Sequence, residues 1–155
     1  MRSLLTLVVL LVAIGISAPV SYAQGAAKTG PDPSTVRDAD LEKDSLHNLE
    51  VARHYFKLKK AYVAAIKRCE EIDAGNPNFA KMDEVLFIAG ESSLRLADNR
   101  GKQKTKEKTA DQLREDARMY LSRLVSGYPN SAFLKQAETD LQALGGPITP
   151  ASSKP

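Results

Sequence analysis

Residues 61–77 read AYVAAIKRCEEIDAGNP and carry the periodicity that decides the fold of this chain. Apolar residues recur there at three- and four-residue intervals, which is the stripe of an amphipathic helix: Tyr62, Ala65, Ile66, Cys69 and Ile72. The stripe runs directly into Gly75-Asn76-Pro77, and glycine followed by proline is a helix stop signal. We therefore predict a helix that ends at this tripeptide.

The same spacing predicts four more helices along the chain. The helix before this segment has Asp44 as its N-cap and carries Leu46, Leu49, Ala52, Tyr55 and Phe56. The third carries Met82, Val85, Leu86, Ala89, Leu94 and Ala97. The fourth carries Leu113, Ala117, Tyr120, Leu121 and Leu124. The last opens at Asn130 or Ser131 and carries Phe133, Leu134, Ala137, Leu141 and Leu144. No segment alternates apolar and polar residues over the length of a strand, so we predict an all-α fold.

Two of the helices end in the same way, which indicates an internal repeat of helical pairs. Gly127-Tyr128-Pro129 matches Gly75-Asn76-Pro77, and each preceding helix has a small residue near its middle, Ala65 or Ala117. The repeat is longer than the usual helical-pair unit of about 34 residues. We attribute the excess to residues 98–111 (DNRGKQKTKEKTAD), a basic insert in the second pair that we expect to lie outside the packed core.

Several positions fall at tetratricopeptide-type spacings: Phe56, Tyr62, Ala65, Ile66, Pro77, Leu86, Gly90, Ala117 and Pro129. Small residues such as Gly90 and Ala117 let paired helices approach closely, so we predict that these two face each other. More particularly, AYVAAIKRCEEI, the helix that contains GES, and YPNS with its closing helix resemble the BamD-like (YfiO-like) envelope proteins. The resemblance implies about five helices in antiparallel pairs that form a short solenoid, and a role in assembling outer-membrane proteins.

The chain differs from that family in two respects. The family's lipidated N-terminal cysteine is absent, and only about two and a half helical pairs are present where the full-length member has roughly twice that number. In addition, Lys60 stands where a small residue is expected between the first two helices. The resemblance therefore implies a short, non-lipidated relative.

The N-terminal residues predict export. Arg2, the apolar run at residues 4–14 and Ser21-Tyr22-Ala23 form a secretory signal peptide over residues 1–23, with cleavage after Ala23. An uncleaved anchor is the alternative. Residues 24–43 and 145–155 are rich in glycine, proline and small polar residues, so we expect a disordered linker and a disordered tail around a domain at residues 44–144. The predicted location is the periplasm, with association with the outer membrane as a further expectation.

Residues that could perform catalysis are few. His47 and His54 lie seven positions apart on one helix, about 10.5 Å along its axis, which is too far for one metal ion. The carboxylates Glu70, Glu71 and Asp73 are expected at a solvated helix edge, and the single cysteine, Cys69, is expected to be a buried thiol. No P-loop, G-x-S-x-G or H-E-x-x-H motif is present. We therefore expect no enzymatic activity, metal or cofactor, with an unrecognised hydrolase as the remote alternative.

A protein-binding surface is the leading functional hypothesis. In helical-pair arrays the first helix of each pair lines the concave face, and the residues there that the packing stripes leave over form the predicted groove: His47, Glu50, His54, Lys57, Glu84, Phe87, Glu91, Leu94 and Arg95. Two alternatives stay open, that this is only a solvated helix face, and that the chain is a structural module that associates with itself.

The insert gives the second predicted contact. Its cations could attract an acidic protein or the head groups of an anionic membrane: Arg100, Lys102, Lys104, Lys106 and Lys108. A plain solvated loop is the alternative. Nucleic acid is not an expected partner, because the net charge is only +3 and no basic platform interleaved with aromatic residues is present.

Overall fold

The computed structural model describes residues 38–148, and within this range it contains five α-helices and no β-strand. The helices are α2 (Ala39–His54), α3 (Tyr62–Gly75), α4 (Met82–Ala97), α5 (Ala110–Gly127) and α6 (Leu134–Ala143), and a π-helical turn, η1 (Tyr55–Lys59), extends α2. The all-α prediction is confirmed. None of the described helices is long and apolar enough to cross a membrane. The predicted signal peptide, most of the predicted linker and the last seven residues of the predicted tail lie outside the described residues.

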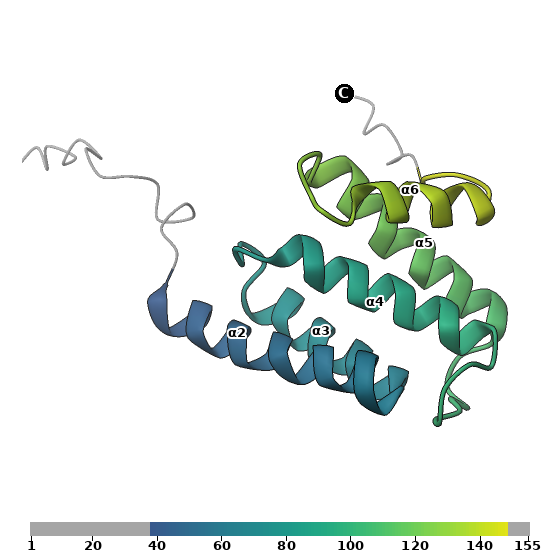
Figure 1. The fold of residues 1–155 in the computed structure, drawn as a ribbon, viewed down its shortest axis with the longest axis horizontal. Coiled ribbons are helices and arrows are strands. Elements are labelled where there is room, and N and C mark those ends of the chain that lie inside the picture. Colours follow the sequence, from purple (N-terminus) through teal and green to yellow (C-terminus); the bar gives the residue numbers. More distant parts are fainter. Residues whose placement is uncertain (1–37, 149–155) are drawn as a thin grey trace, which may run out of the picture. The chain divides into compact units, whose positions relative to one another are not determined.

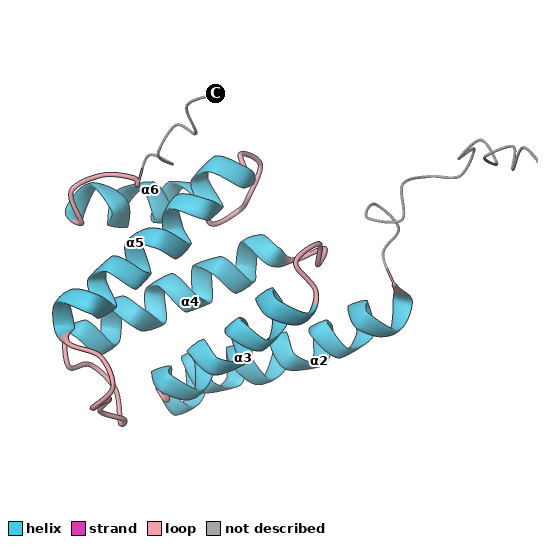
Figure 2. Ribbon diagram, turned by 180° about the vertical axis from the view of Figure 1, so that it is seen from behind, coloured by secondary structure: helices cyan, strands magenta, loops and turns pink. Residues whose placement is uncertain are grey.

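Successive helices run in opposite directions and pack side by side (Figure 1). α3 packs against both α2 and α4, and α5 packs against both α4 and α6. As a result, the turn from α2 to α3 and the loop from α4 to α5 lie at one end of the helices (Figure 2). The starts of α2, α4 and α6 lie at the opposite end.

The core follows most of the predicted stripes. All five predicted core residues of α5 are buried, and in α3 only Ile66 is half-buried. In α2 the prediction was wrong for Leu46, which is 39% exposed, while Ser45 takes the buried position instead. A polar residue is tolerated there because the Ser45 hydroxyl accepts a hydrogen bond from the Asn76 side-chain amide at 3.1 Å.

The start of α2 also differs from the prediction. The helix begins at Ala39, and its N-cap is Asp38, whose carboxylate accepts hydrogen bonds from the backbone N–H groups of Asp40 (2.9 Å) and Leu41 (3.3 Å). Asp44 lies inside the helix rather than at its N-cap, so that prediction was wrong. The carboxylate of Glu42, in the first turn, accepts from the backbone N–H of Ala80 at 3.3 Å, which ties the extra turn to the segment before α4.

The last helix begins later than predicted, at Leu134 rather than at Asn130 or Ser131. The Ser131 hydroxyl accepts a hydrogen bond from the backbone N–H of Phe133 at 3.2 Å, which forms a local turn instead of a helix start. The turn brings the Phe133 ring against the Phe87 ring of α4, with centroids 4.5 Å apart.

The predicted close approach of α4 and α5 is confirmed. A Cβ atom added to Gly90 would lie 2.7 Å and 2.8 Å from the Cγ and Cδ2 atoms of Leu121, and 3.5 Å from the carbonyl oxygen of Ala117. Those distances leave no room for a side chain. Gly90 therefore lies at a close approach of the two helices.

The basic insert lies between α4 and α5 and is exposed except at the half-buried Thr105, as expected for a segment outside the core. It is nevertheless attached to the turn between α2 and α3. The backbone N–H of Lys102 donates to the carbonyl oxygen of Lys60 at 3.1 Å, and the Gln103 side-chain oxygen accepts from the backbone N–H of Ala64 at 3.3 Å. Gly101, at φ +105°, lies so near the Tyr62 ring that a Cβ atom there would be 2.6 Å from it. The loop is thus docked at its base.

Candidate partner-binding groove

One side of α4 faces solvent between contacts to α2 and contacts to α6. We call this surface, together with the adjoining edges of α2 and α6, the α4 groove. The predicted groove residues of α4 are Glu84, Phe87, Glu91, Leu94 and Arg95, and of these Glu91, Leu94 and Arg95 line an open cleft against α6. Each of them is half-buried except Glu91, which is 9% exposed.

Toward α2, the groove is closed by an ion pair. The Arg53 guanidinium donates through two nitrogens to the two carboxylate oxygens of Glu84, with an Nε–Oε1 distance of 2.6 Å. This hydrogen bond, ahead of the opposing effect of burial, lowers the pKa of Glu84 below its ordinary value. Bidentate geometry and partial burial make it a stronger contact than an ordinary surface ion pair.

Arg95 fixes the next part of the groove floor. Its guanidinium donates to one Glu91 oxygen from Nε at 3.1 Å and from Nη2 at 2.8 Å. The same group lies 4.5 Å from the ring centroid of Phe56 and 5.7 Å from that of Tyr62, as in a cation–π contact. Arg95 therefore links α4 to the turn between α2 and α3.

Toward α6, the first contact is aromatic. The rings of Phe87 and Phe133 are stacked, with centroids 4.5 Å apart and planes at 18°. Nearby, the Ser131 hydroxyl donates to the Asp83 carboxylate at 2.7 Å. Phe87, a predicted groove residue, is thus half-buried and partly covered by Phe133 of its own chain.

Two carboxyl groups meet where α4 and α6 come together. Burial raises the pKa of Glu91 above its ordinary value, and the neighbouring Asp140 carboxyl raises it further, while Arg95 opposes both effects. Asp140 also accepts hydrogen bonds from the Gln136 amide at 3.1 Å. The charged form of Glu91 is therefore disfavoured here, whereas the charged form of Glu84 is favoured by Arg53.

Beyond this point α4 and α6 leave an open cleft of about 460 Å³. Charges of both signs surround a short apolar strip in it, and the lining residues are Glu91, Leu94, Arg95, Asp98, Arg100, Arg114, Gln136, Asp140, Ala143 and Leu144. Arg114 is shared between Asp98 at 3.6 Å and Asp111 at 3.3 Å, both on the exposed surface. A cleft of this kind can accept apolar side chains and the polar backbone of an extended or helical segment.

The predicted groove residues of α2 are less closely integrated. His47, Glu50, His54 and Lys57 are all exposed. Glu50 and Lys57 are near enough to the Arg53–Glu84 pair to affect its electrostatics, with Glu50 acting on Arg53 and Lys57 on Glu84. His54 packs its ring edge-on near Tyr55, with centroids 6.3 Å apart, on its own helical segment.

Sequence reasoning missed the α6 side of the groove. Phe133, Gln136 and Asp140 contribute to it, as does Arg53 on α2. A signal was present, because α6 is the first helix of an incomplete third pair and by the same rule should lie beside α4. Arg53 gave no such signal, since only its pairing with a residue 31 positions away distinguishes it.

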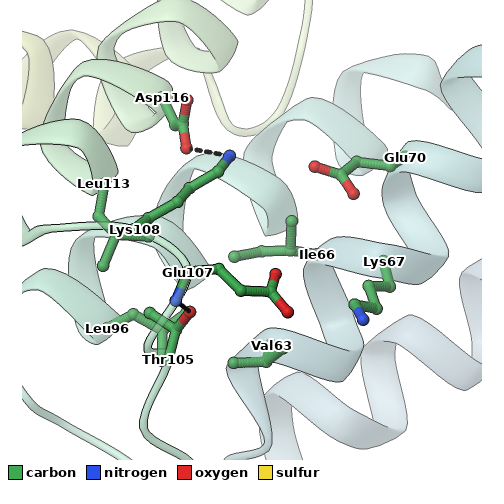
Figure 3. A pocket seen from close by; sticks show the side chains of 10 residues that line it. All are labelled: Val63, Ile66, Lys67, Glu70, Leu96, Thr105, Glu107, Lys108, Leu113 and Asp116. Atoms are coloured by element: carbon green, nitrogen blue, oxygen red, sulfur yellow. Dashed lines mark hydrogen bonds and ion pairs between the residues drawn. The ribbon is translucent and has the colours of Figure 1, made fainter.

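A smaller cavity lies on another part of the molecule, between α3, α5 and the basic loop (Figure 3). The Lys108 ammonium turns there to the Asp116 carboxylate at 2.6 Å, and Val63, Ile66, Leu96 and Leu113 line the apolar part. The volume of about 80 Å³ is far below that of most small-molecule sites, which is about 300 to 1,000 Å³. The cavity is therefore too small to be a typical ligand site, and Lys108 forms an ion pair with Asp116 within the chain.

The reactive groups elsewhere in the described range are also held structurally. Cys69 is buried as predicted, and burial raises the pKa of its thiol, which disfavours the reactive thiolate. Burial likewise raises the pKa of Tyr120, whose hydroxyl donates to Glu70 at 3.3 Å. Within residues 38–148, no cluster of three or more histidine, cysteine, aspartate or glutamate side chains is placed to hold a metal ion.

None of the family models, curated proteins or solved structures compared with this chain matches it. The described fold defines the class of protein as all-α, with the antiparallel pairs α2–α3 and α4–α5 followed by α6.

Proposed function

We propose that this protein is a non-enzymatic scaffold of the bacterial cell envelope that binds a segment of another protein in the α4 groove. The observation that carries the proposal is the open cleft between α4 and α6, where Leu94 and Leu144 lie among charged side chains. Burial of a partner's apolar side chain against this strip would contribute affinity, and the charges around it would select the register.

Two expectations from the sequence extend this proposal. We propose that residues 1–23 act as a signal peptide and that the scaffold resides in the periplasm, and the BamD-like resemblance suggests that its partners take part in outer-membrane protein assembly. We further propose that the two helical pairs and α6 form a short solenoid whose concave side is the α4 groove. The contacts of α4 with α2 on one side and α6 on the other support this arrangement.

Site-specific photocrosslinking tests the groove directly. A photoreactive amino acid at position 94 of the full chain would be irradiated in bacterial envelope extract, and the products identified by mass spectrometry. The matched control carries the same group at position 119, because Met119 is an apolar residue of α5 that is 40% exposed and does not line the cleft. We expect specific crosslinks to another protein from position 94 and none from position 119.

Other outcomes of this experiment have definite meanings. Crosslinks between two copies of the chain from position 94 would replace the scaffold proposal with the self-associating module. The same products from both positions would mean that the cleft has no selective role, and the proposal would fail. A thermal melt of each labelled protein, compared with that of the unlabelled chain, shows that both are folded.

A further inference from the structure

The end of the molecule that holds the α2–α3 turn and the α4–α5 loop carries two basic segments that are far apart in the sequence. The first is Lys57, Lys59 and Lys60, at the end of α2. The second is Arg100, Lys102, Lys104 and Lys106, in the loop. The hydrogen bond from the Lys102 N–H to the Lys60 carbonyl, at 3.1 Å, joins the two segments directly.

These seven cations are available for an external partner. None of them forms a salt bridge among the described residues, and all seven are exposed. Lys108, the remaining cation of the loop, differs because it pairs with Asp116 at 2.6 Å. Glu107 is the one acidic residue at positions 99–108. The surface therefore has a concentrated positive charge although the whole chain is only mildly basic.

An exposed leucine lies within this charge. Leu58 is between Lys57 and Lys59, and 71% of its surface is exposed, the largest value among the exposed large apolar residues of the described range. An isolated apolar side chain on a protruding turn gains nothing from the fold. It would be stabilised by transfer into the interfacial region of a bilayer, where the flanking lysines can reach the head groups.

The backbone of Lys60 gives a second indication. It has φ +50°, in the left-handed region where glycine or asparagine is favoured and other residues are strained. The sequence has lysine at a position where the fold by itself prefers glycine.

We propose that this end of the helices, together with the exposed Leu58, docks on an anionic lipid bilayer. Flexible lysines outnumber arginine by six to one on this surface, which suits diffuse attraction to a charged plane better than bidentate recognition of one ligand. Of the α4–α6 cleft and the smaller cavity beside Lys108, only the cleft reaches one of these side chains, at Arg100. This surface adjoins the α4 groove at Lys57 and at Arg100, which lines the α4–α6 cleft.

Vesicle co-sedimentation of the full chain tests the proposal. Vesicles of phosphatidylcholine alone are compared with vesicles that are one third phosphatidylglycerol, at low and at high salt. The apolar run at residues 4–14 is present in every variant, so binding to neutral vesicles measures the contribution of this run. We expect stronger binding to the anionic vesicles, and we expect this excess to decline as salt screens the charges.

Two triple variants with the same net charge locate the surface. Lys59→Gln, Lys102→Gln and Lys104→Gln together should reduce the excess binding by about a hundredfold, since each charge near an anionic surface contributes about fivefold. The control combines Lys43→Gln, Lys81→Gln and Lys135→Gln, all exposed near the starts of α2, α4 and α6, at the opposite end of the helices. It should retain at least about half of the wild-type affinity.

Two single variants separate binding from folding. Lys60→Gly should weaken binding about fivefold while leaving the melting temperature unchanged or higher, because glycine relieves the positive φ. Leu58→Ser should reduce binding severalfold without affecting the melt, because the side chain is exposed.

Equal binding to neutral and anionic vesicles, or an equal loss in both triple variants, would overturn the proposal. The proposal would also fail if the first triple variant kept its binding to anionic vesicles but lost binding to an acidic protein or to an oligonucleotide.

Discussion

The two sides of α4 are held in different ways. On the side toward α5, Gly90 brings the helices into direct contact against Ala117 and Leu121. On the side toward α2 and α6, long side chains make the contacts, through the Arg53–Glu84 ion pair and the Phe87–Phe133 stack. The first side has no free space, whereas the second leaves a cleft of about 460 Å³.

This difference shows how one helix can hold the fold together on one side and leave an open cleft on the other. A close-packed interface loses stability with any added atom, because interiors are packed like organic crystals. An interface of paired polar and aromatic side chains tolerates gaps, since its contacts are individually satisfied. Substitutions on α4 and its neighbours should therefore fall into classes of very different size.

The largest effect is expected from Gly90→Leu. The new side chain would begin less than 3 Å from Leu121, so the helices must separate, at a cost of about 3 kcal/mol. Chemical denaturation measures this cost. The control is Gly127→Leu, at a glycine with no atom within 4 Å of an added Cβ, where we expect a change of no more than about 0.5 kcal/mol. A neutral or stabilising Gly90→Leu would mean that α4 and α5 do not cross there.

An intermediate effect is expected from Glu84→Gln. At neutral pH the loss of the charge-assisted pair with Arg53 should cost about 1 to 2 kcal/mol. Because the fold lowers the pKa of Glu84, its contribution is present above the ordinary value of about 4.5 and is lost as pH falls through the lowered folded value. The difference in unfolding free energy between wild type and variant should therefore decrease toward zero at acidic pH.

The exposed pair Arg68–Glu71 provides the control for this measurement. Its atoms are 2.6 Å apart, but half of the Glu71 side chain is exposed, so Glu71→Gln should cost less than about 0.5 kcal/mol. If both variants lose the same amount, the Arg53–Glu84 pair contributes no more than a surface contact.

The smallest effect, and one of opposite sign, is expected from Glu91→Gln. The folded state raises the pKa of Glu91, so its favourable contribution exists at low pH and is lost as pH rises through the raised value. At neutral pH the neutral amide should therefore stabilise the protein by less than about 1 kcal/mol, and the gain should vanish below the ordinary range of a carboxyl group. Denaturation across this pH range measures it. A marked loss at neutral pH would mean that the Arg95–Glu91 contact outweighs burial and Asp140.

The candidate site could be predicted only in part, and α4 shows why. Periodicity placed Glu84, Phe87, Glu91, Leu94 and Arg95 on one face correctly, because helical geometry is local. It could not show that Glu84 pairs with Arg53 or that Phe87 is covered by Phe133, because these partners lie 31 and 46 positions away. Glu84 and Phe87, which were predicted to contact a partner protein, therefore already contact residues of their own chain.

The sequence by itself determined the five helices, their stops at Gly75 and Gly127, and the close approach at Gly90, since each depends on local spacing and on residues with special backbone or steric properties. The sequence also carries the local cap of α2, because the Asp38 carboxylate accepts from the backbone N–H groups of Asp40 and Leu41, and the prediction missed it. The tertiary structure adds the bond from Ala80 to Glu42, which joins two separate segments. It also decided that Lys60 and Lys102 share one end of the molecule. Antiparallel packing brings together turns that are distant in the sequence, and no local pattern encodes which charges will then be neighbours.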